Sequence, residues 1–363
     1  MNASPERDGE FMKLANAFAQ RGWGRTYPNP LVGAVVVRDG VVAGSGWHRE
    51  HGGLHAELAA LQAAGSGSRG GTLYVTLEPC RHQGKQPPCT DAIVAAGIVR
   101  VVIGMRDPNP EAAGGAEVLR AAGIAVDVVD ESLVTGNFRF LHRFKNFPRP
   151  YIAVKLAVSM DGMIADAAGN SRWVSGEAAR DWVHWLRAGF GAIGVGARTA
   201  IADQARLTVR GSIQPRVPPV RVVFDRSGLL PVDHVAFNSV AVAPLVIIVG
   251  SGVGEVRRTS LTAAGARLIV ADTTTDALKM LAESGVDSML IEGGGRFAGA
   301  LLRGGLVDRV YQLQCPRWLG DGTPAWAGLG APAIAASQRW RITRVDQIGS
   351  NAETDVLIEM EPT

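Results

Sequence analysis

The sequence predicts two α/β domains, because short apolar strands alternate with helices along nearly its whole length. Its 363 residues exceed the usual length of one domain. The segment 144–150, Phe-Lys-Asn-Phe-Pro-Arg-Pro, interrupts this alternation just before a long strand-like run. We therefore expect a domain boundary near residue 146, with one domain over 1–146 and a second over 147–363.

In the first half, apolar residues at helical spacing predict a helix over 8–21. Two apolar runs over 31–46 meet at Arg38-Asp39-Gly40, and the Asp-Gly pair favours a tight hairpin there. The expected elements that follow are helix 55–64, strand 73–77, helix 90–96, strand 99–104, helix 117–122 and strand 125–129.

The second half is predicted to be α/β as well. Its expected strands are 151–158, 192–195, 221–224, 245–249, 267–270, 288–291 and 310–313, and its expected helices lie around 177–187, 274–284 and 296–304. The last two apolar segments, 340–345 and 354–360, flank Gly349-Ser350-Asn351. They predict an antiparallel hairpin that closes the sheet.

Composition and charge narrow the classes of function. The net charge is only +3, with acidic and basic residues interspersed, whereas proteins that hold duplex nucleic acid usually carry a concentrated basic face. No apolar run reaches the roughly 18 to 20 residues that cross a bilayer, and the start of the sequence lacks a secretory signal. We expect a cytoplasmic protein that binds neither nucleic acid nor a membrane.

Three cysteines in so long a chain do not suggest a disulfide scaffold. Cys80 and Cys89, together with His55, stand at predicted strand ends or helix starts. One imidazole and two thiolates leave the fourth tetrahedral position of a zinc ion open, as in catalytic zinc sites. Cys89 would also lie at a helix N-terminus, which favours a thiolate. Cys315 has no ligand neighbour, so we expect a packed thiol there.

Glu57 follows His55 by two residues and is placed to take a proton from the attacking water and return it to the leaving ammonia. The order of these residues matches the zinc-deaminase pattern H-x-E…P-C-x-x-C, in which the glutamate is not a ligand. One departure is that eight residues, 81–88, separate the cysteines. The alternative is an accidental surface histidine with two buried thiols.

Further motifs surround this pattern: Pro-Asn-Pro-Leu-Val-Gly at 28–33, Glu-Pro-Cys at 78–80, His82, Gly84, and Pro-Pro-Cys at 87–89. With them the sequence resembles the bifunctional riboflavin-biosynthesis deaminase/reductase family over nearly its whole length. The resemblance implies a cytidine-deaminase-like three-layer α/β/α domain followed by a dihydrofolate-reductase-like α/β domain. Lys85 and Gln86 depart from the arginine and threonine more usual in that family.

The resemblance also implies the reaction. The substrate would be 2,5-diamino-6-(ribosylamino)-4-pyrimidinone 5′-phosphate, deaminated with Zn²⁺ and then reduced with NADPH from ribosyl to ribityl. In the deaminase site it implies catalysis by Glu57 and zinc binding by His55, Cys80 and Cys89. We expect Asn29, His48 and His82 to contact the substrate, with His51 as a further candidate; a solvated loop position is the alternative for each histidine.

The second half matches the family's reductase at Lys155–Gly162, Ser171-Arg172-Trp173 and Glu292–Gly295, among other positions. The cofactor contacts that the resemblance implies are Ala157, Trp173, Thr199, Asp203, Gly294 and Gly295. The implied substrate contacts are Lys155, Ser171, Arg187, Leu207, Arg210 and Glu292.

The glycine run at 293–295 is the element of the reductase pattern with the clearest physical logic. It lies between a predicted strand and a predicted helix, where backbone amides can hold a phosphate. A purely structural tight turn also needs glycine. The run is not G-x-G-x-x-G, which disfavours a Rossmann fold. Gln204-Ala205 replace the family's usual Asp-Pro after Asp203, which weakens the assignment of the cofactor loop.

Three alternatives remain open at this point. The second half could have lost its reductase activity, and a measurement of NADPH consumption with the deaminated intermediate would show whether it has. An RNA-editing deaminase would have two residues between its cysteines and a basic surface, and the sequence has neither. A non-catalytic zinc module would not need Glu57. The sequence does not determine the oligomeric state, so a homo-oligomer also stays open.

Overall fold

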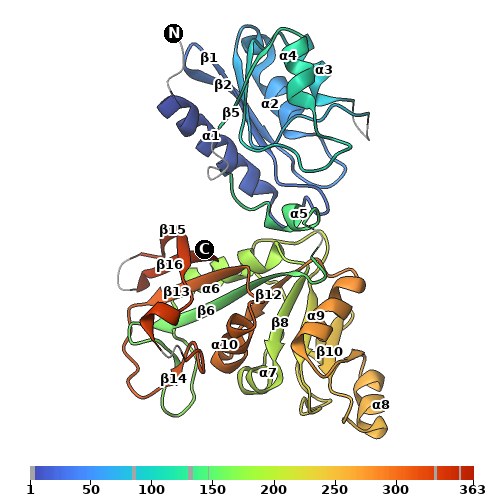
Figure 1. Cartoon of the computed structure of the whole chain (residues 1–363), viewed down its shortest axis with the longest axis vertical. Helices are drawn as coiled ribbons and strands as arrows, with labels where there is room; N and C mark the ends of the chain where they lie inside the picture. Colours follow the sequence, from blue (N-terminus) through green and yellow to red (C-terminus); the bar gives the residue numbers. More distant parts are fainter. Residues whose placement is uncertain (1–4, 84–86, 130–133, 146, 331–332, 351–352) are drawn as a thin grey trace. The chain divides into compact units, whose positions relative to one another are not determined.

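The computed structural model describes residues 5–83, 87–129, 134–145, 147–330, 333–350 and 353–363. The chain divides into two compact units, Met1–Asn146 and Phe147–Thr363 (Figure 1). Gly84, Lys85, Gln86 and Asn351, which the sequence analysis singled out, lie outside the described residues. Within the described part of the chain, no helix is long and apolar enough to cross a membrane.

The first unit is built on a five-stranded sheet with the strand order β2-β1-β3-β4-β5. β1 is antiparallel to both β2 and β3, and β3, β4 and β5 are parallel. The elements are α1 (Pro5–Ala19), β1 (Gly33–Arg38), β2 (Val41–Trp47), α2 (Ala56–Ala64), β3 (Thr72–Val75), α3 (Cys89–Ala95), β4 (Arg100–Ile103), α4 (Gly115–Ala121), β5 (Ala125–Val128) and α5 (Phe138–His142). The sequence predicted all of them except α5.

The side chains of β1 point alternately to the two faces of the sheet, and both faces are covered by helices, which gives this unit three layers. Val35 and Val37 pack with Met12 and Ala15 of α1 on one face of the sheet. Ala34 and Val36 point to the other face, into a cluster that includes residues of α2, α3 and α4. Both faces of the sheet are thus buried, and the predicted α/β/α architecture is confirmed.

β1 begins two residues later than the sequence predicted, and the side chain of Asn137 accounts for the difference. Its Oδ1 accepts a hydrogen bond from the Leu31 backbone nitrogen at 2.7 Å, and its Nδ2 donates to the Leu31 carbonyl oxygen at 2.9 Å. Both backbone groups of Leu31 are therefore satisfied by a side chain rather than by the sheet. Sequence periodicity cannot reveal such a contact between distant residues.

The second unit is built on a nine-stranded sheet with the order β11-β10-β9-β8-β12-β6-β13-β16-β15. The strands of this sheet are β6 (Tyr151–Ser159), β8 (Ala192–Gly196), β9 (Val220–Phe224), β10 (Leu245–Val249), β11 (Arg267–Val270), β12 (Ser288–Glu292), β13 (Arg309–Cys315), β15 (Trp340–Ile348) and β16 (Asp355–Pro362). Two short strands, β7 (Met163–Ala165) and β14 (Thr323–Pro324), pair separately with each other. The helices are α6 (Glu177–Ala188), α7 (Ala197–Asp203), α8 (Glu255–Ala263), α9 (Thr274–Glu283) and α10 (Gly295–Arg303).

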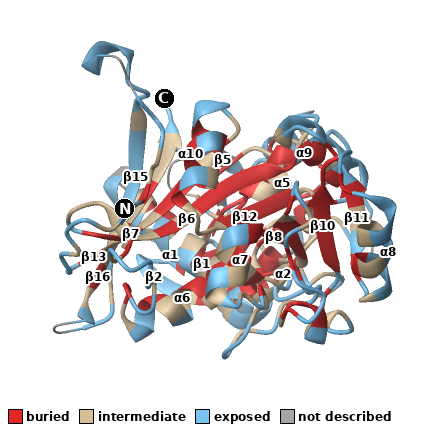
Figure 2. Ribbon diagram, turned by 90° about the horizontal axis from the view of Figure 1, so that it is seen from below, coloured by how far each residue is buried: buried red, intermediate tan, exposed pale blue. Residues whose placement is uncertain are grey.

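The central strands of this sheet are buried on both faces, as Figure 2 shows for β6, β12, β8 and β10. One face packs against residues of α9 and α10, and the other against residues of α7 and α8. The predicted strands and the predicted closing hairpin, β15 with β16, are confirmed. The sequence analysis missed α7 and α8, short helices that connect parallel neighbouring strands.

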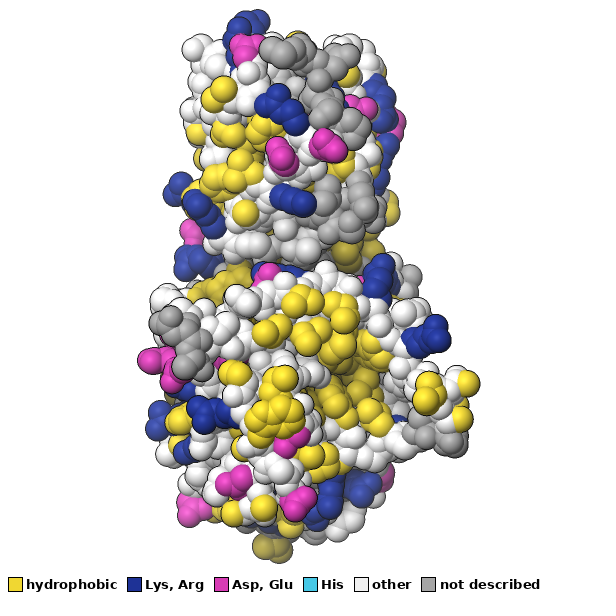
Figure 3. Space-filling model, turned by 90° about the vertical axis from the view of Figure 1, so that its left-hand side faces the viewer, with side chains coloured by type: hydrophobic (Ala, Val, Ile, Leu, Met, Phe, Trp, Pro, Cys, Tyr) yellow, Lys and Arg dark blue, Asp and Glu magenta, His cyan; other side chains and the backbone are white. Residues whose placement is uncertain are grey.

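The sheet ends at β15, which is less covered than the central strands. Ile342 and Val345 on this strand are each 58% exposed. Figure 3, which faces the side of the molecule where β13, β15 and β16 lie, shows hydrophobic side chains gathered on this surface of the second unit.

Candidate active sites

The three predicted zinc ligands of the first unit converge on one point. His55 is the N-cap residue of α2, Cys80 follows β3, and Cys89 is the first residue of α3. Their ligand atoms all lie within 4.8 Å of one another. His55 Nδ1 is 3.2 Å from the Cys89 sulfur and 3.6 Å from the Cys80 sulfur. A tetrahedral zinc ion with ordinary bond lengths would hold nitrogen and sulfur about 3.6 Å apart, so the geometry fits zinc.

The pKa values of the two cysteines in this cluster also favour cation binding. A hydrogen bond from the Cys89 thiol, followed by one from His55, lowers the pKa of Cys80 to about 4. The same hydrogen bond to Cys80, together with burial, raises the pKa of Cys89. These contacts favour the thiolate form of Cys80. Zinc binding would release the proton of Cys89, because cysteine binds zinc as a thiolate.

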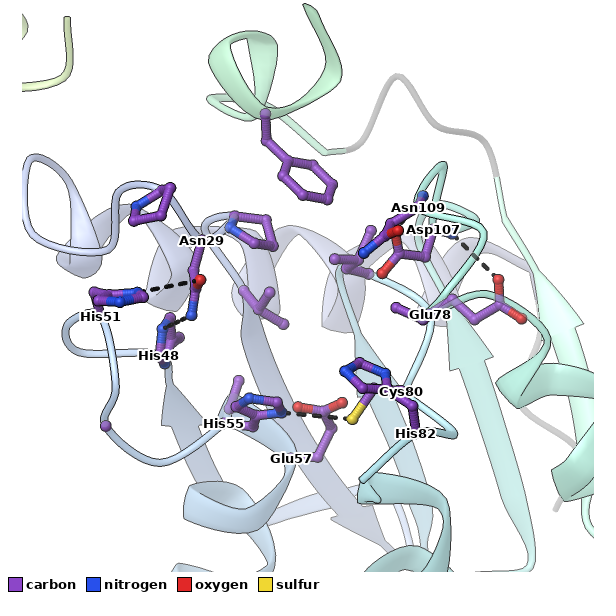
Figure 4. Close-up of a pocket in the computed structure, with 18 of the residues that line it drawn as sticks. Asn29, His48, His51, His55, Glu57, Glu78, Cys80, His82, Asp107 and Asn109 are labelled. Carbon is purple, nitrogen blue, oxygen red and sulfur yellow. Dashed lines mark hydrogen bonds between the residues drawn. The ribbon is translucent and has the colours of Figure 1, made fainter. Parts of the chain in front are cut away.

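Glu57 lies in the first turn of α2 and is only 4% exposed. Figure 4 shows its carboxylate between His55 and Cys80 at the floor of a cavity. Burial raises the pKa of Glu57 to about 7, above the value usual for a carboxyl group. A carboxyl group in this state can accept and return a proton near neutral pH.

The cavity has a volume of about 390 Å³. Asn29, His48 and His51 lie together on one of its sides (Figure 4). The His48 Nδ1 lies 2.9 Å from the Leu54 carbonyl oxygen, so this nitrogen is the donor and Nε2 accepts from the Asn29 amide at 3.1 Å. Burial lowers the pKa of His48 and keeps it neutral. The Asn29 Oδ1 lies 3.3 Å from His51 Nδ1, which fixes the orientation of the amide.

Glu78, Asp107 and Asn109 lie on the other side of the cavity (Figure 4). Glu78 is buried and accepts hydrogen bonds from Arg106 and from the backbone nitrogens of Asp107 and Ala116. Its role is therefore to hold the loop that carries Asp107. Burial raises the pKa of Asp107 to about 6.

The sequence analysis missed Asp107 and Asn109. A signal for them exists: they follow β4, which is parallel to β3, so the carboxyl ends of both strands meet at one edge of the sheet. The predicted substrate contacts Asn29, His48 and His82 all line the cavity. Their contact with a substrate stays a prediction.

In the second unit, three of the predicted charged residues meet near the carboxyl end of β12. Glu292 at the end of β12 lies beside Lys155 of β6 in the sheet register. Arg187 of α6 donates two hydrogen bonds to the Glu292 carboxylate, at 2.5 and 2.8 Å, and one to the Thr208 carbonyl oxygen at 2.9 Å. Burial lowers the pKa of Lys155, and the carboxylate of Glu292 opposes that shift.

Arg210 and Leu207, two further predicted substrate contacts, differ from Arg187 in the burial and contacts of their side chains. The Arg210 backbone nitrogen donates to His184 Nδ1 at 3.2 Å, and its side chain is exposed. His184 was not singled out from the sequence. Leu207 is only 3% exposed, and its side chain belongs to the hydrophobic cluster between β8 and α7. Because that side chain is committed to the core, only the backbone of Leu207 can reach a substrate.

The predicted cofactor residues gather around α7 and the start of α10. The Ser171 hydroxyl donates to the Asp203 carboxylate at 2.9 Å. Gly294 has a φ of +77°, and a Cβ added there would lie 2.8 Å from Thr199 Oγ1. A Cβ at Gly295 would lie 2.2 Å from the Pro324 carbonyl oxygen, so this glycine is needed for close packing. The glycine turn therefore leaves backbone, without side chains, facing Thr199.

Two further predicted cofactor residues lie on different elements. Trp173 is 61% exposed, and its ring lies 4.6 Å from the Arg180 guanidinium. A tryptophan so exposed is not a core residue. Ala157 lies on β6, two residues beyond Lys155.

Comparison with known proteins agrees with this division into two sites. Residues 5–105 match the model of the cytidine and deoxycytidylate deaminase zinc-binding region, and residues 150–353 match the RibD C-terminal domain. The riboflavin biosynthesis protein RibD of Aquifex aeolicus is 37% identical over 95% of this chain and 97% of that protein. The chain belongs to the RibD family.

Solved structures of RibD proteins extend the match to the whole fold. Acinetobacter baumannii RibD is 34% identical, with a TM-score of 0.79 over 99% of this chain and 100% of that one. A structure from Thermotoga maritima, described as a diaminohydroxyphosphoribosylaminopyrimidine deaminase/5-amino-6-(5-phosphoribosylamino)uracil reductase, also gives 34% identity and a TM-score of 0.79, over 99% of both chains.

Membership in the RibD family confirms several expectations. The chain is a bifunctional deaminase and reductase of riboflavin biosynthesis, with zinc and NADPH as its cofactors. The reductase-domain match disfavours the alternative of a second half that has lost reduction. The roles of individual residues stay predictions.

Proposed function

We propose that residues 1–146 hydrolyse the 2-amino group of 2,5-diamino-6-(ribosylamino)-4-pyrimidinone 5′-phosphate, and that residues 147–363 then reduce the ribosyl group of the product with NADPH. The observation that carries this proposal is the cluster of His55, Cys80 and Cys89 with Glu57 buried beside it in a cavity. The name of the Thermotoga maritima relative, which combines a deaminase with a reductase of this kind, supports both steps.

Glu57 is the proposed proton carrier of the deamination. His55, Cys80 and Cys89 would hold the zinc ion, which would supply Lewis acidity toward a water molecule. Glu57 takes one proton from that water as its oxygen bonds to the ring carbon, and passes the proton to the amino nitrogen. The carbon–nitrogen bond breaks and ammonia leaves. The ring keeps the oxygen, and the second water proton becomes the ring N–H of the product.

The two sides of the cavity orient the ring in this proposal. The Asn29 amide is held by His48 and His51, so it presents a fixed polar group to the substrate. Asp107 on the other side offers a carboxylate that can accept an N–H of the amino-substituted ring. Fixed partners of this kind hold the reacting carbon near the metal and Glu57 at little entropic cost.

The second unit has to hold an opened sugar against the nicotinamide. An N-glycosidic ribose can open to an imine, and NADPH supplies the hydride that the imine carbon accepts. Lys155 and Glu292 are the proposed contacts of the opened sugar, because they lie side by side on β6 and β12. Arg187 positions Glu292 through its two hydrogen bonds. Arg210, whose side chain is exposed, is the better candidate for the substrate phosphate.

The cofactor is proposed to bind at the start of α10. Gly294 and Gly295 leave the backbone of this turn accessible, and the N-terminus of the helix favours a phosphate. Thr199 lies beside the turn, and the Ser171–Asp203 hydrogen bond fixes the end of α7. Trp173 is exposed and able to cover a cofactor ring.

A single substrate experiment tests the proposal. The purified chain is supplied with the diaminopyrimidine phosphate, with and without NADPH, and the products are identified by mass spectrometry. We expect the deaminated ribosyl compound without NADPH and the deaminated ribityl compound with it. Absence of deamination would contradict the first assignment. Deamination without any oxidation of NADPH would restore the deaminase-only alternative.

The remaining expectations about partners and location also stand as proposals. The chain is proposed to work in the cytoplasm without nucleic acid, in keeping with its net charge of +3. A homo-oligomer is supported by the exposed apolar residues Ile342 and Val345 on β15, since an edge strand with exposed apolar side chains favours association. Sedimentation velocity on the purified protein tests this point.

A further inference from the structure

The deaminase cavity has an uneven distribution of charge. The acidic residues Glu78 and Asp107 lie on one side, and Glu57 lies at its floor. The opposite side carries the neutral group of Asn29 and His48, with His51. Among the described residues that line the cavity, Arg143 is the only lysine or arginine. Among the described residues, Arg143 is therefore the one permanent cation of the cavity wall, and its position matters for a charged substrate.

Arg143 directly follows α5, and a hydrogen bond to the backbone holds its side chain in place. Its Nη1 donates to the Pro28 carbonyl oxygen at 3.0 Å. The guanidinium thus lies beside the Pro28 carbonyl group, one residue before Asn29. Its side chain is exposed, and no carboxylate in the described part of the chain pairs with it. The hydrogen bond to Pro28 leaves other N–H donors of the guanidinium available to a ligand.

Two other arginines of the first unit, Arg106 and Arg139, have side-chain partners of other kinds. Arg106 donates to the carboxylates of Glu78 and Glu117. Arg139, four residues before Arg143 on α5, places its guanidinium 3.4 Å from the centre of the Tyr27 ring. Arg143 differs from both of these arginines in lining the cavity, and no described carboxylate pairs with its guanidinium.

We infer that Arg143 binds the 5′-phosphate of the deaminase substrate and so makes the first site selective for the phosphorylated compound. This inference rests on the proposed function. A phosphate monoester carries nearly two negative charges near pH 7, so it is repelled by the Asp107 carboxylate, whereas the charge of Glu78 is compensated by Arg106. A guanidinium binds phosphate oxygens through paired N–H donors. The phosphate then lies at the Pro28–Pro30 side, and the amino-substituted ring faces the carboxylates.

A purely structural role for Arg143 is the competing explanation, because its hydrogen bond to Pro28 also ties α5 to the segment 28–30. The two explanations predict different substrate dependence. A structural role affects the phosphorylated and the dephosphorylated substrate alike. A phosphate contact affects only the phosphorylated one.

The test measures ammonia release, without NADPH, from the phosphorylated substrate and from its dephosphorylated counterpart. We expect Arg143→Gln to raise the KM for the phosphorylated substrate about tenfold or more, as the loss of a charge-assisted contact implies, with little change in kcat. Its kcat/KM for the dephosphorylated compound should equal that of the wild type. Arg143→Lys, which keeps the charge, should recover part of the preference. Arg139→Gln is the matched control and should leave the preference unchanged.

The outcomes separate this inference from the proposed function. If Arg143→Gln keeps the wild-type ratio of the two kcat/KM values, or lowers both values equally, the phosphate assignment is overturned. A wild-type enzyme that deaminates both compounds equally well also overturns it, while leaving the deaminase itself intact. A wild-type enzyme that deaminates neither compound refutes the proposed function instead. Zinc content and thermal unfolding of each variant identify any loss caused by misfolding.

Discussion

Gly294→Ala gives a sharp test of the proposed cofactor site. Gly294 has a φ of +77°, where an alanine costs about 1–2 kcal/mol of folding free energy. The new Cβ would also lie 2.8 Å from Thr199 Oγ1, closer than real Cβ atoms approach, so the turn or Thr199 must move. If the backbone of this turn binds a phosphate of NADPH, that movement should raise the KM for NADPH about tenfold, equivalent to about 1.4 kcal/mol.

Gly305→Ala is the matched control for this variant. Gly305 has a φ of +62° and lies just beyond the other end of α10, but a Cβ there would meet nothing within 4 Å. Both variants should lower the free energy of unfolding through the positive φ, Gly294→Ala by more because of its clash with Thr199, and only Gly294→Ala should weaken the binding of NADPH. The assay is NADPH oxidation with the deaminated substrate. An unchanged KM in Gly294→Ala, or an equal rise in Gly305→Ala, would refute the cofactor assignment.

Three further predictions concern the first unit. Glu57→Gln should retain zinc but lose deamination by about 10²–10⁴-fold, since an amide cannot carry the proton; near-normal ammonia release would remove Glu57 from the mechanism. Removing zinc with a chelator should stop ammonia release yet leave NADPH oxidation with the deaminated substrate intact, and parallel loss of both would contradict separate sites. A hydrogen bond from Arg100 lowers the pKa of Asp8 in the folded protein. The stability that Asp8 contributes should therefore be full above its unfolded pKa of about 3.9 and should be lost as the pH falls through the lower folded pKa. The free energies of unfolding of wild type and Asp8→Asn should converge in acid, and a difference that stays constant with pH would count against this ion pair.

Much of the zinc site could be predicted from the sequence because each ligand marks the end of an element. His55 and Cys89 stand at helix starts, and Cys80 follows a strand. Parallel strands bring such ends to one edge of the sheet, so motif order alone predicts that they meet. The layered fold could also be predicted, because the spacing of apolar residues along the sequence differs between helices and strands.

Other features depend on contacts between distant residues and could not be predicted in this way. The start of β1 is set by Asn137, more than a hundred positions further along the chain. The assignment of Leu207 as a substrate contact did not anticipate that its side chain packs in the core. Asp107 acquires its raised pKa only from burial in the folded unit. Each of these properties arises from tertiary structure, which local patterns do not encode.

The identity of the atoms around the metal tests the central claim most directly. Zinc-edge X-ray absorption on the purified protein should show about one zinc per chain with two sulfur neighbours near 2.3 Å, from Cys80 and Cys89, and lighter neighbours near 2.0–2.1 Å, from His55 and a water molecule. A protein without zinc after expression in zinc-replete medium, or a zinc ion surrounded by four sulfur atoms or by none, would contradict the open catalytic site on which the account depends.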